Sequence, residues 1–199
     1  MTAWWRWLAP MAIIAVAALV LLGLGAWDLR RHPPARLLLS AHHEWDYVRA
    51  VERAMSQAQK RIWVMMYVAR LGADIDPEHP VEFTLQALVD AAKRGVDVRV
   101  CLDQSRNWED PTVIDSKHEQ PAAWLRARGV RVIEDELERI SHAKVVLIDN
   151  ETVVIGSHNW TFSALALNRE ASLFVKDAAL AAEVDQELFQ NVPGWNLTE

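Results

Sequence analysis

Residues 141–160 read SHAKVVLIDNETVVIGSHNW, and six of their side chains fit one spaced pattern. The pattern is H-x-K-x(4)-D-x(6)-G-S-x-N, and its fixed positions are occupied by His142, Lys144, Asp149, Gly156, Ser157 and Asn159. Each of these residue types makes up only a few per cent of an average protein, so a chance match in one chain has odds below roughly one in a million. The pattern therefore indicates a specific chemical function.

Two apolar runs, 143–148 and 152–155, are joined by a short polar turn and predict a β-hairpin. Side chains two apart on a strand leave the same face, so His142 and Lys144 are expected to project together. Asp149 falls on the opposite face by the same alternation. We therefore expect Asp149 to be a structural hydrogen-bond acceptor at the strand end rather than a catalytic group.

The pattern resembles the signature of the phospholipase D superfamily, whose members break phosphodiester bonds. The resemblance covers residues 37–195 and includes the segments AAKRGVDVRVCLD (91–103) and WLRARGVRVIED (124–135). In layout the chain is most similar to the small bacterial endonucleases of this superfamily that carry a single motif. The N-terminally anchored group of mitochondrial cardiolipin hydrolases and piRNA-pathway nucleases comes next.

The resemblance implies a role for each patterned residue. His142 would attack phosphorus and form a phosphohistidine, for which imidazole is suited by its unperturbed pKa of about 6.5. Lys144 would hold the non-bridging phosphate oxygens, whose charge must be stabilised in the transition state. Asn159 would donate an N–H to the same oxygens, and Ser157 would hydrogen-bond phosphate or catalytic groups. Gly156 would let backbone approach closely.

A nucleophilic imidazole also needs a partner that orients it through its second nitrogen. Glu170, in the segment LNREASLF, stands where family members carry an acidic residue after an Asn. It is the candidate for this role. The alternative is a surface glutamate at the start of a strand.

One histidine cannot easily serve both as nucleophile and as the acid that protonates the leaving group. Family members with two motifs supply both groups from one chain, whereas this chain has one motif. The resemblance therefore implies a homodimer that shares one active site on its two-fold axis. No metal and no other cofactor is expected, since no carboxylate pair has the spacing of a two-metal nuclease and Cys101 is the single cysteine.

The beginning of the chain predicts a membrane segment. Residues 7–27 contain no charged side chain, which is about the length needed to cross a bilayer as a helix. We interpret residues 1–27 as an N-terminal membrane anchor, and the alternative is a secretory signal. The resemblance to bacterial members implies the inner membrane. Positive charges after the segment favour a cytoplasmic domain, and the short N-terminal flank favours a periplasmic one.

Residues 28–40 contain Pro33 and Pro34 and are expected to form a linker. The catalytic domain is then expected over 41–195, where amphipathic and continuous apolar segments alternate. Helices are predicted over 44–60, 81–94, 119–128 and 177–190, and strands over 62–68, 96–102, 130–133, 143–148, 152–155 and 171–175. This order predicts an α/β fold, an α-β-α sandwich with a mixed central sheet like that of phospholipase D, preceded by one N-terminal transmembrane helix.

The substrate is the open question. The loop 103–118 offers Arg106, Trp108 and Lys117, which could contact a nucleic acid, or the loop is simply solvated. The net charge is −6, and an acidic run, EDELE (134–138), directly precedes the motif and would repel a polyanion if it lined the groove. We expect a membrane-anchored, metal-independent endonuclease acting on DNA or RNA. The alternatives are a phospholipase D or cardiolipin hydrolase and, less favoured, an inactive protein that binds nucleic acid or lipid.

Overall fold

The computed structural model describes residues 35–40, 45–72, 79–107, 109–110, 112–115 and 117–196. The membrane anchor expected over 1–27, most of the expected linker and the side chain of Trp108 lie outside these residues. Within the described ranges, no helix combines the length and the apolar character that crossing a bilayer requires.

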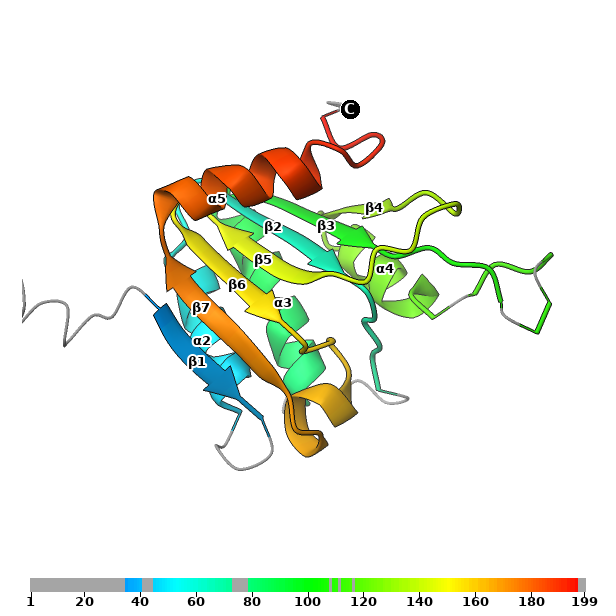
Figure 1. Ribbon diagram of the computed structural model, residues 1–199, viewed down its shortest axis with the longest axis horizontal. Coiled ribbons are helices and arrows are strands. Elements are labelled where there is room, and N and C mark those ends of the chain that lie inside the picture. The colour runs from blue at the N-terminus through cyan, green and yellow to red at the C-terminus, as the bar shows by residue number, and fades with distance from the viewer. Residues whose placement is uncertain are drawn as a thin grey trace, which may run out of the picture. The chain divides into compact units, whose positions relative to one another are not determined.

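The described residues form a seven-stranded mixed sheet (Figure 1), which confirms the expected mixed central sheet. Its strands are β1 (Ala35–Leu39), β2 (Arg61–Met66), β3 (Asp97–Leu102), β4 (Arg131–Glu134), β5 (Lys144–Ile148), β6 (Thr152–Gly156) and β7 (Ala171–Lys176). They lie in the order β1-β7-β6-β5-β2-β3-β4. The pairs β2–β3 and β3–β4 are parallel, and all other neighbours are antiparallel. The hairpin predicted over 143–155 is confirmed by the pairing of β5 with β6.

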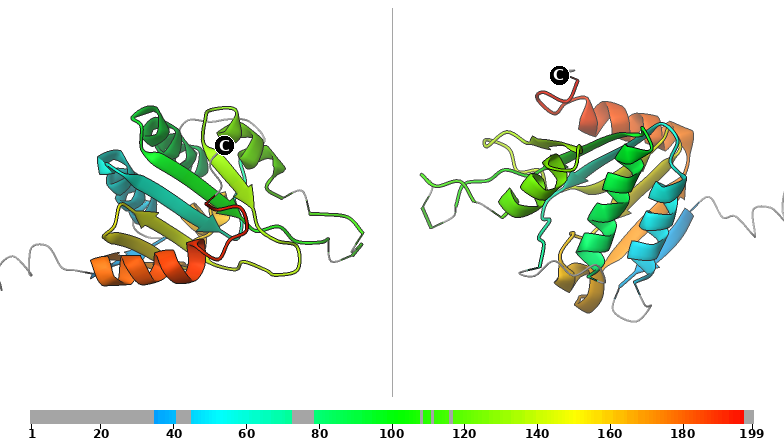
Figure 2. Two further views of the ribbon diagram at one scale, coloured as in Figure 1. Left: turned by 90° about the horizontal axis from the view of Figure 1, so that it is seen from above. Right: turned by 180° about the vertical axis from the view of Figure 1, so that it is seen from behind.

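Helices cover both faces of the sheet (Figure 2). On one face lie α2 (Asp46–Gln57), α3 (Pro80–Lys93) and α4 (Glu119–Arg126). On the other face lies α5 (Ala178–Val184), which continues into the π-helical turn η2 (Asp185–Phe189). Another π-helical turn, η1 (Ser163–Leu167), lies between β6 and β7 in the sequence and was not anticipated.

The central strands have apolar side chains on both faces because both faces are covered. In β2, Ile62, Val64 and Met66 pack in the core under α2 and α3. Trp63 and Met65 belong to a second hydrophobic core, which lies under α5 and η2 on the other face of the sheet. There the Trp63 ring contacts Phe189 and Trp195. Burial on both faces thus explains why the apolar run of this strand is continuous.

The last residues of the linker expected over 28–40 form the strand β1 instead. Residues 35–39 pair with β7 in antiparallel register, from Ala35↔Val175 to Leu39↔Ala171, and Leu38 is fully buried. The compact unit accordingly begins at Ala35 rather than at residue 41. Five residues with a single buried side chain are too few to show a strand period in the sequence.

Candidate active site

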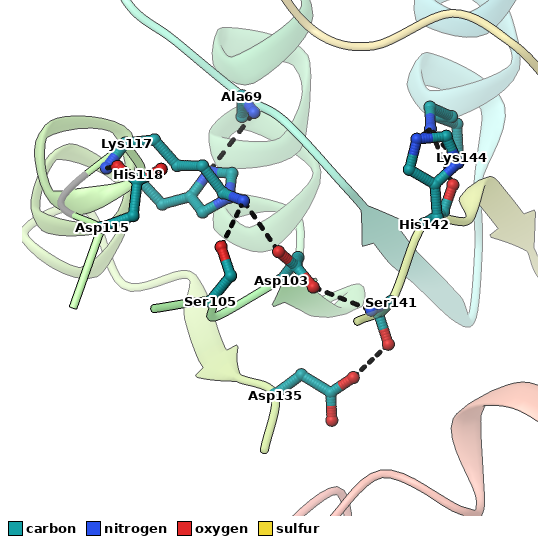
Figure 3. A network of polar contacts seen from close by, with 10 residues as sticks. All are labelled: Ala69, Asp103, Ser105, Asp115, Lys117, His118, Asp135, Ser141, His142 and Lys144. Atoms are coloured by element: carbon teal, nitrogen blue, oxygen red, sulfur yellow. Dashed lines mark hydrogen bonds and ion pairs between the residues drawn. The ribbon is translucent and has the colours of Figure 1, made fainter. Parts of the chain in front are cut away.

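The site lies where the beginning of β5 meets the ends of β2 and β3. Because β5 runs antiparallel to β2, its first residue, Lys144, pairs with Met66, the last residue of β2. The backbone of Tyr67, which follows β2, donates to the carbonyl of Ala143 at 3.0 Å. His142, which precedes β5, therefore lies at the edge of the sheet where the parallel strands have their carboxyl ends (Figure 3).

His142 and Lys144 lie against each other. The Lys144 Nζ is 3.2 Å from His142 Nδ1 and 3.3 Å from His142 Nε2, and it donates to the His142 carbonyl at 2.7 Å. His142 is exposed, whereas Lys144 is only 7% exposed. The two residues were expected to share a strand face, but His142 lies outside β5, so the contact arises from the lysine side chain bending back towards the residue before the strand.

Burial lowers the pKa of the Lys144 ammonium, and the negative charges of Glu170 and Asp103 oppose that shift. The Tyr67 ring lies beside both members of the pair. Its centroid is 4.2 Å from the His142 ring centroid and 4.6 Å from Lys144 Nζ. The site thus places an ammonium, an exposed imidazole and an aromatic ring in direct contact.

Ser157 and Glu170 form a second polar group at the amino end of β7. The Ser157 hydroxyl donates to Glu170 Oε2 at 2.5 Å, and Asn168 Nδ2 donates to Glu170 Oε1 at 3.0 Å. Among the described residues, no hydrogen bond joins Glu170 to His142. The sheet order explains this, because β6 separates β7 from β5. The orienting role of Glu170 stays a prediction.

Asn159 follows β6 in the loop that leads into η1. Its side-chain Oδ1 is buried and has no hydrogen-bond partner among the described residues. Buried amide oxygens are normally paired, so this atom is an exception. Its role as a phosphate ligand stays a prediction.

Asp149 and Gly156 are explained by the backbone around them. The Asp149 carboxylate accepts from the backbone N–H groups of Gln59, Lys60 and Arg61, with the shortest contact, 2.7 Å, at Lys60. It therefore ties the hairpin to the segment that enters β2. A Cβ on Gly156 would lie 2.4 Å from the Ala171 carbonyl oxygen, so only glycine fits where β6 passes β7.

The loop 103–118 supplies fewer substrate contacts than the sequence suggests. The Lys117 ammonium pairs with Asp103 at 2.8 Å, and both side chains are almost fully buried. Lys117 was expected as a possible substrate contact, but this ion pair withdraws it from the surface. Arg106 is exposed and its backbone bridges to Ile114, whereas Trp108 lies outside the described residues.

His158 occupies a variable position of the sequence pattern and was not singled out. Its ring is fully buried, stacks on Tyr47 at 4.2 Å between centroids, and shares a 2.8 Å hydrogen bond with the Ser172 hydroxyl through Nδ1. Burial lowers the pKa of His158 to about 4, against a weaker opposing effect of Glu170. This histidine is a packing residue that holds the loop after β6 in place.

The sequence also offered no reason to select Tyr67, Ser141 or Asp135. Tyr67 and Ser141 contact residues far away in the chain, whereas the Asp135 carboxylate accepts from Ser141, only 6 residues later. Asp103 is different, because it directly follows the alternating strand β3. Polar residues at the carboxyl ends of parallel strands commonly reach active sites, and that rule could have found it. No group of three or more His, Cys, Asp or Glu side chains that could hold a metal ion occurs within the described ranges.

The chain is similar to one protein family and to curated proteins from bacteria. The family described as cardiolipin synthase, PLD-like domain, matches residues 51–192. A phospholipase D from Rickettsia bellii is 36% identical over 95 residues, which are 48% of this chain and 43% of that protein. A cardiolipin synthase A from Pseudomonas syringae pv. syringae is 32% identical over 136 residues, which are 68% of this chain and 26% of that protein. The chain thus matches less than half the length of these curated relatives.

Solved structures share the fold. A phospholipase D family member, Nuc from Salmonella typhimurium, superposes with a TM-score of 0.59 at 25% identity. The match covers 76% of this chain and 90% of the Nuc chain. NucT from Helicobacter pylori superposes with a TM-score of 0.59 at 18% identity. The match covers 76% of this chain and 91% of the NucT chain. The second likeness shows the fold alone.

The buried His158 makes stability depend on pH. An unfolded histidine titrates near pH 6.5, whereas native His158 has a pKa of about 4, so the unfolded state binds this proton more tightly. The stability contributed by the neutral ring is present above about pH 6.5 and is lost as the pH falls towards 4. We expect His158→Gln to reduce the loss of unfolding free energy between about pH 7 and about pH 4.5 by about 2 kcal/mol. Urea denaturation of both proteins at the two pH values measures this, and an equal loss in the variant would contradict it.

Proposed function

This chain belongs to the phospholipase D superfamily, and we propose that it is a phosphodiesterase that acts through a covalent phosphohistidine at His142. The observation that carries the proposal is the contact of the Lys144 ammonium with the exposed His142 ring. The imidazole offers a nucleophilic nitrogen, and the ammonium offers a positive charge within reach of the same phosphate group.

In the first step, a neutral His142 nitrogen attacks phosphorus. A phosphorus–nitrogen bond forms while the bond from phosphorus to the leaving oxygen breaks, and a second histidine gives that oxygen its proton. In the second step, the same histidine takes a proton from water, whose oxygen attacks phosphorus and releases His142. Throughout, Lys144 in its charged form stabilises the non-bridging oxygens.

Ser157, Glu170 and Asn159 complete the proposed machinery. Ser157 already donates to Glu170, so that pair forms one polar unit at the edge of the site. We assign Glu170 to orient a catalytic imidazole, and Ser157 and Asn159 to bind phosphate. Asp149 and Gly156 support the backbone and take no part in the chemistry.

The second histidine is proposed to come from another copy of the chain. Among the described residues, the other histidines are engaged elsewhere: His158 and His118 are buried, and His79 accepts from the backbone N–H of Val81 at the start of α3. A homodimer with two His142 side chains facing one phosphate would supply both the nucleophile and the acid.

Nucleic acid is the substrate we favour. The chain carries a single motif and covers 90% of Nuc, so the two are of similar size and layout. The acidic run 134–138 would repel a polyanion less than its sequence suggests, because three of its four carboxylates are engaged: Glu134 pairs with Arg126, Glu136 pairs with Arg139, and Asp135 is buried. We propose a metal-independent endonuclease acting on DNA or RNA, anchored to the membrane through residues 7–27.

A phospholipid is the second candidate, and two observations favour it. The curated relatives include proteins named phospholipase D and cardiolipin synthase A. The uncharged run 7–27 would also hold the domain near a lipid surface.

These proposals are tested by incubating the full-length chain, purified in mild detergent, with EDTA and one substrate at a time. Single-stranded DNA, RNA, duplex DNA and phospholipid vesicles containing cardiolipin distinguish the candidates. We expect cleavage of a nucleic acid that is insensitive to EDTA, and a loss of at least about a thousandfold in kcat for His142→Ala. Lys144→Met should lose comparable activity, whereas the matched control Lys176→Met, an exposed lysine at the far end of β7, should not.

Three outcomes would overturn parts of this account. Hydrolysis of vesicles alone would replace the nuclease with the phospholipase. Activity abolished by EDTA would contradict the phosphohistidine mechanism. A His142→Ala variant with the rate of the wild type would remove His142 from the site.

The shared site predicts a particular response to mixing. If both His142 side chains of a dimer are required, wild-type and His142→Ala chains co-expressed in equal amounts form active dimers in only about a quarter of cases. The specific activity should therefore fall to about a quarter of that of the wild type. Independent sites in each chain would leave about half. Chains carrying two different affinity tags allow the ratio in the purified mixture to be measured beside the activity.

A further inference from the structure

Ser141, the residue before His142, is held through both of its polar groups. Its backbone N–H donates to Asp103 Oδ1 at 2.8 Å, and its hydroxyl donates to the carboxylate of Asp135. Asp103 follows β3 and Asp135 follows β4, so the ends of two parallel strands fix the segment that leads into the motif (Figure 3). The position of His142 along the edge of the sheet thus depends on these carboxylates.

The second carboxylate oxygen of Asp103 is also linked to the catalytic pair, through Lys117 and Tyr67. Asp103 Oδ2 accepts from Lys117 Nζ at 2.8 Å, and Lys117 Nζ lies 4.5 Å from the centroid of the Tyr67 ring. The same ring contacts His142 and Lys144. Asp103 therefore reaches the catalytic pair through the backbone of Ser141 and, separately, through Lys117 and Tyr67.

The burial of this ion pair calls for a reason other than stability. The side chain of Asp103 is 0% exposed and that of Lys117 is 5% exposed. Taking two charges out of water costs free energy that their attraction often only offsets, and well-packed apolar residues are frequently as stable. A buried charged pair whose two ends touch catalytic neighbours is better explained by the geometry it imposes.

We propose that Asp103 is a positioning residue of the active site, which fixes the backbone entering His142 and, through Lys117 and Tyr67, the place of the imidazole beside the Lys144 ammonium. The inference rests on the proposed phosphodiesterase function of His142 and Lys144. It gives the loop after β3 a role in catalysis without contact with the reacting atoms.

The charge of Asp103 gives this role a measurable signature. The groups around Lys144 are His142 and Tyr67, the carboxylates of Asp103 and Glu170, and the Lys117 ammonium, which contacts the same Tyr67 ring. Burial lowers the pKa of Lys144, and the Asp103 carboxylate opposes that effect. Neutralising Asp103 should therefore lower the pKa of Lys144 further and deprotonate it at a lower pH.

The test compares Asp103→Asn with Asp185→Asn in the full-length chain. Asp185 is the matched control, because it forms a similarly short and largely buried ion pair with Arg61 near the opposite end of β2. We expect Asp103→Asn to lower kcat by about tenfold to a hundredfold with little change in KM, as misplacement of a catalytic group does. The basic limb of its kcat profile should move to lower pH by at least about half a unit, whereas Asp185→Asn should leave the limb in place.

Asp103→Asn leaves the Lys117 ammonium buried without its counter-charge, with the neutral Ser105 hydroxyl accepting from it at 3.0 Å, which could prevent folding. The double variant Asp103→Asn, Lys117→Met removes both charges and should recover thermal stability. It should nevertheless keep the low kcat. The basic limb should return towards its wild-type position, because loss of the Lys117 positive charge offsets loss of the Asp103 negative charge near Lys144. A double variant that regained the kcat of the wild type together with its stability would overturn the proposal.

A readout without substrate separates this inference from the proposed function. Competitive acetylation by acetic anhydride, followed peptide by peptide in the mass spectrometer, measures the pKa of Lys144 directly. The value should fall in Asp103→Asn and not in Asp185→Asn, even if the wild-type chain cleaved none of the substrates offered. An unchanged pKa of Lys144 in folded Asp103→Asn would refute the proposal, whereas absent cleavage by the wild type would refute only the phosphodiesterase.

Discussion

The antiparallel pairing of β5 with β2 is the interaction on which the rest of the site depends. Parallel strands place their carboxyl ends at one edge of the sheet, and an antiparallel strand brings its amino end to that same edge. The register from Ile62↔Ile148 to Met66↔Lys144 therefore carries His142 to the ends of β2 and β3. A slip of one residue would turn Lys144 to the opposite face and separate the pair.

Both ends of this pairing are held by carboxylates. At the far end, Asp149 accepts three backbone N–H groups from the segment entering β2, and its own N–H donates to the Arg61 carbonyl at 2.8 Å. At the catalytic end, Asp103 and Asp135 hold Ser141. Three acidic side chains of the chain, Asp103, Asp135 and Asp149, thus accept internal hydrogen bonds that hold one hairpin in place. The net charge of −6 consequently says little about the charge that a substrate would meet.

Much of the fold follows from local patterns in the sequence. The alternating strand β3, the apolar run of β2, and the hairpin of β5 and β6 each have a period that shows in the residues themselves, and the structure places them within a few residues of expectation. β1 could not be found in this way, because its five residues become a strand only by pairing with β7, more than a hundred residues later. The π-helical turn η1 was missed for a similar reason, since it depends on packing rather than on a repeating pattern.

The candidate site likewise has parts that local sequence patterns predict and parts that they do not. Six spaced residues predict the chemistry, and the strand alternation that set Asp149 apart agrees with its contacts to the backbone. What local patterns could not show is the way that residues distant in sequence meet. The ring of Tyr67 contacts two ammonium groups, and Lys117, which looked available to a substrate, is instead paired with Asp103. These contacts are consequences of the strand order, which no single segment encodes.

The most direct test of the account is to look for phosphorus on His142 itself. The wild-type chain would be mixed rapidly with a phosphodiester that it hydrolyses, quenched in alkali within a turnover, and digested for mass spectrometry. The account predicts an adduct on the peptide that contains His142, in which phosphorus is bonded to the imidazole and keeps one ester group of the substrate. It should occur on at most one of the two chains of a dimer, because the other His142 serves as the acid. Turnover at full rate with the adduct on another residue would contradict it.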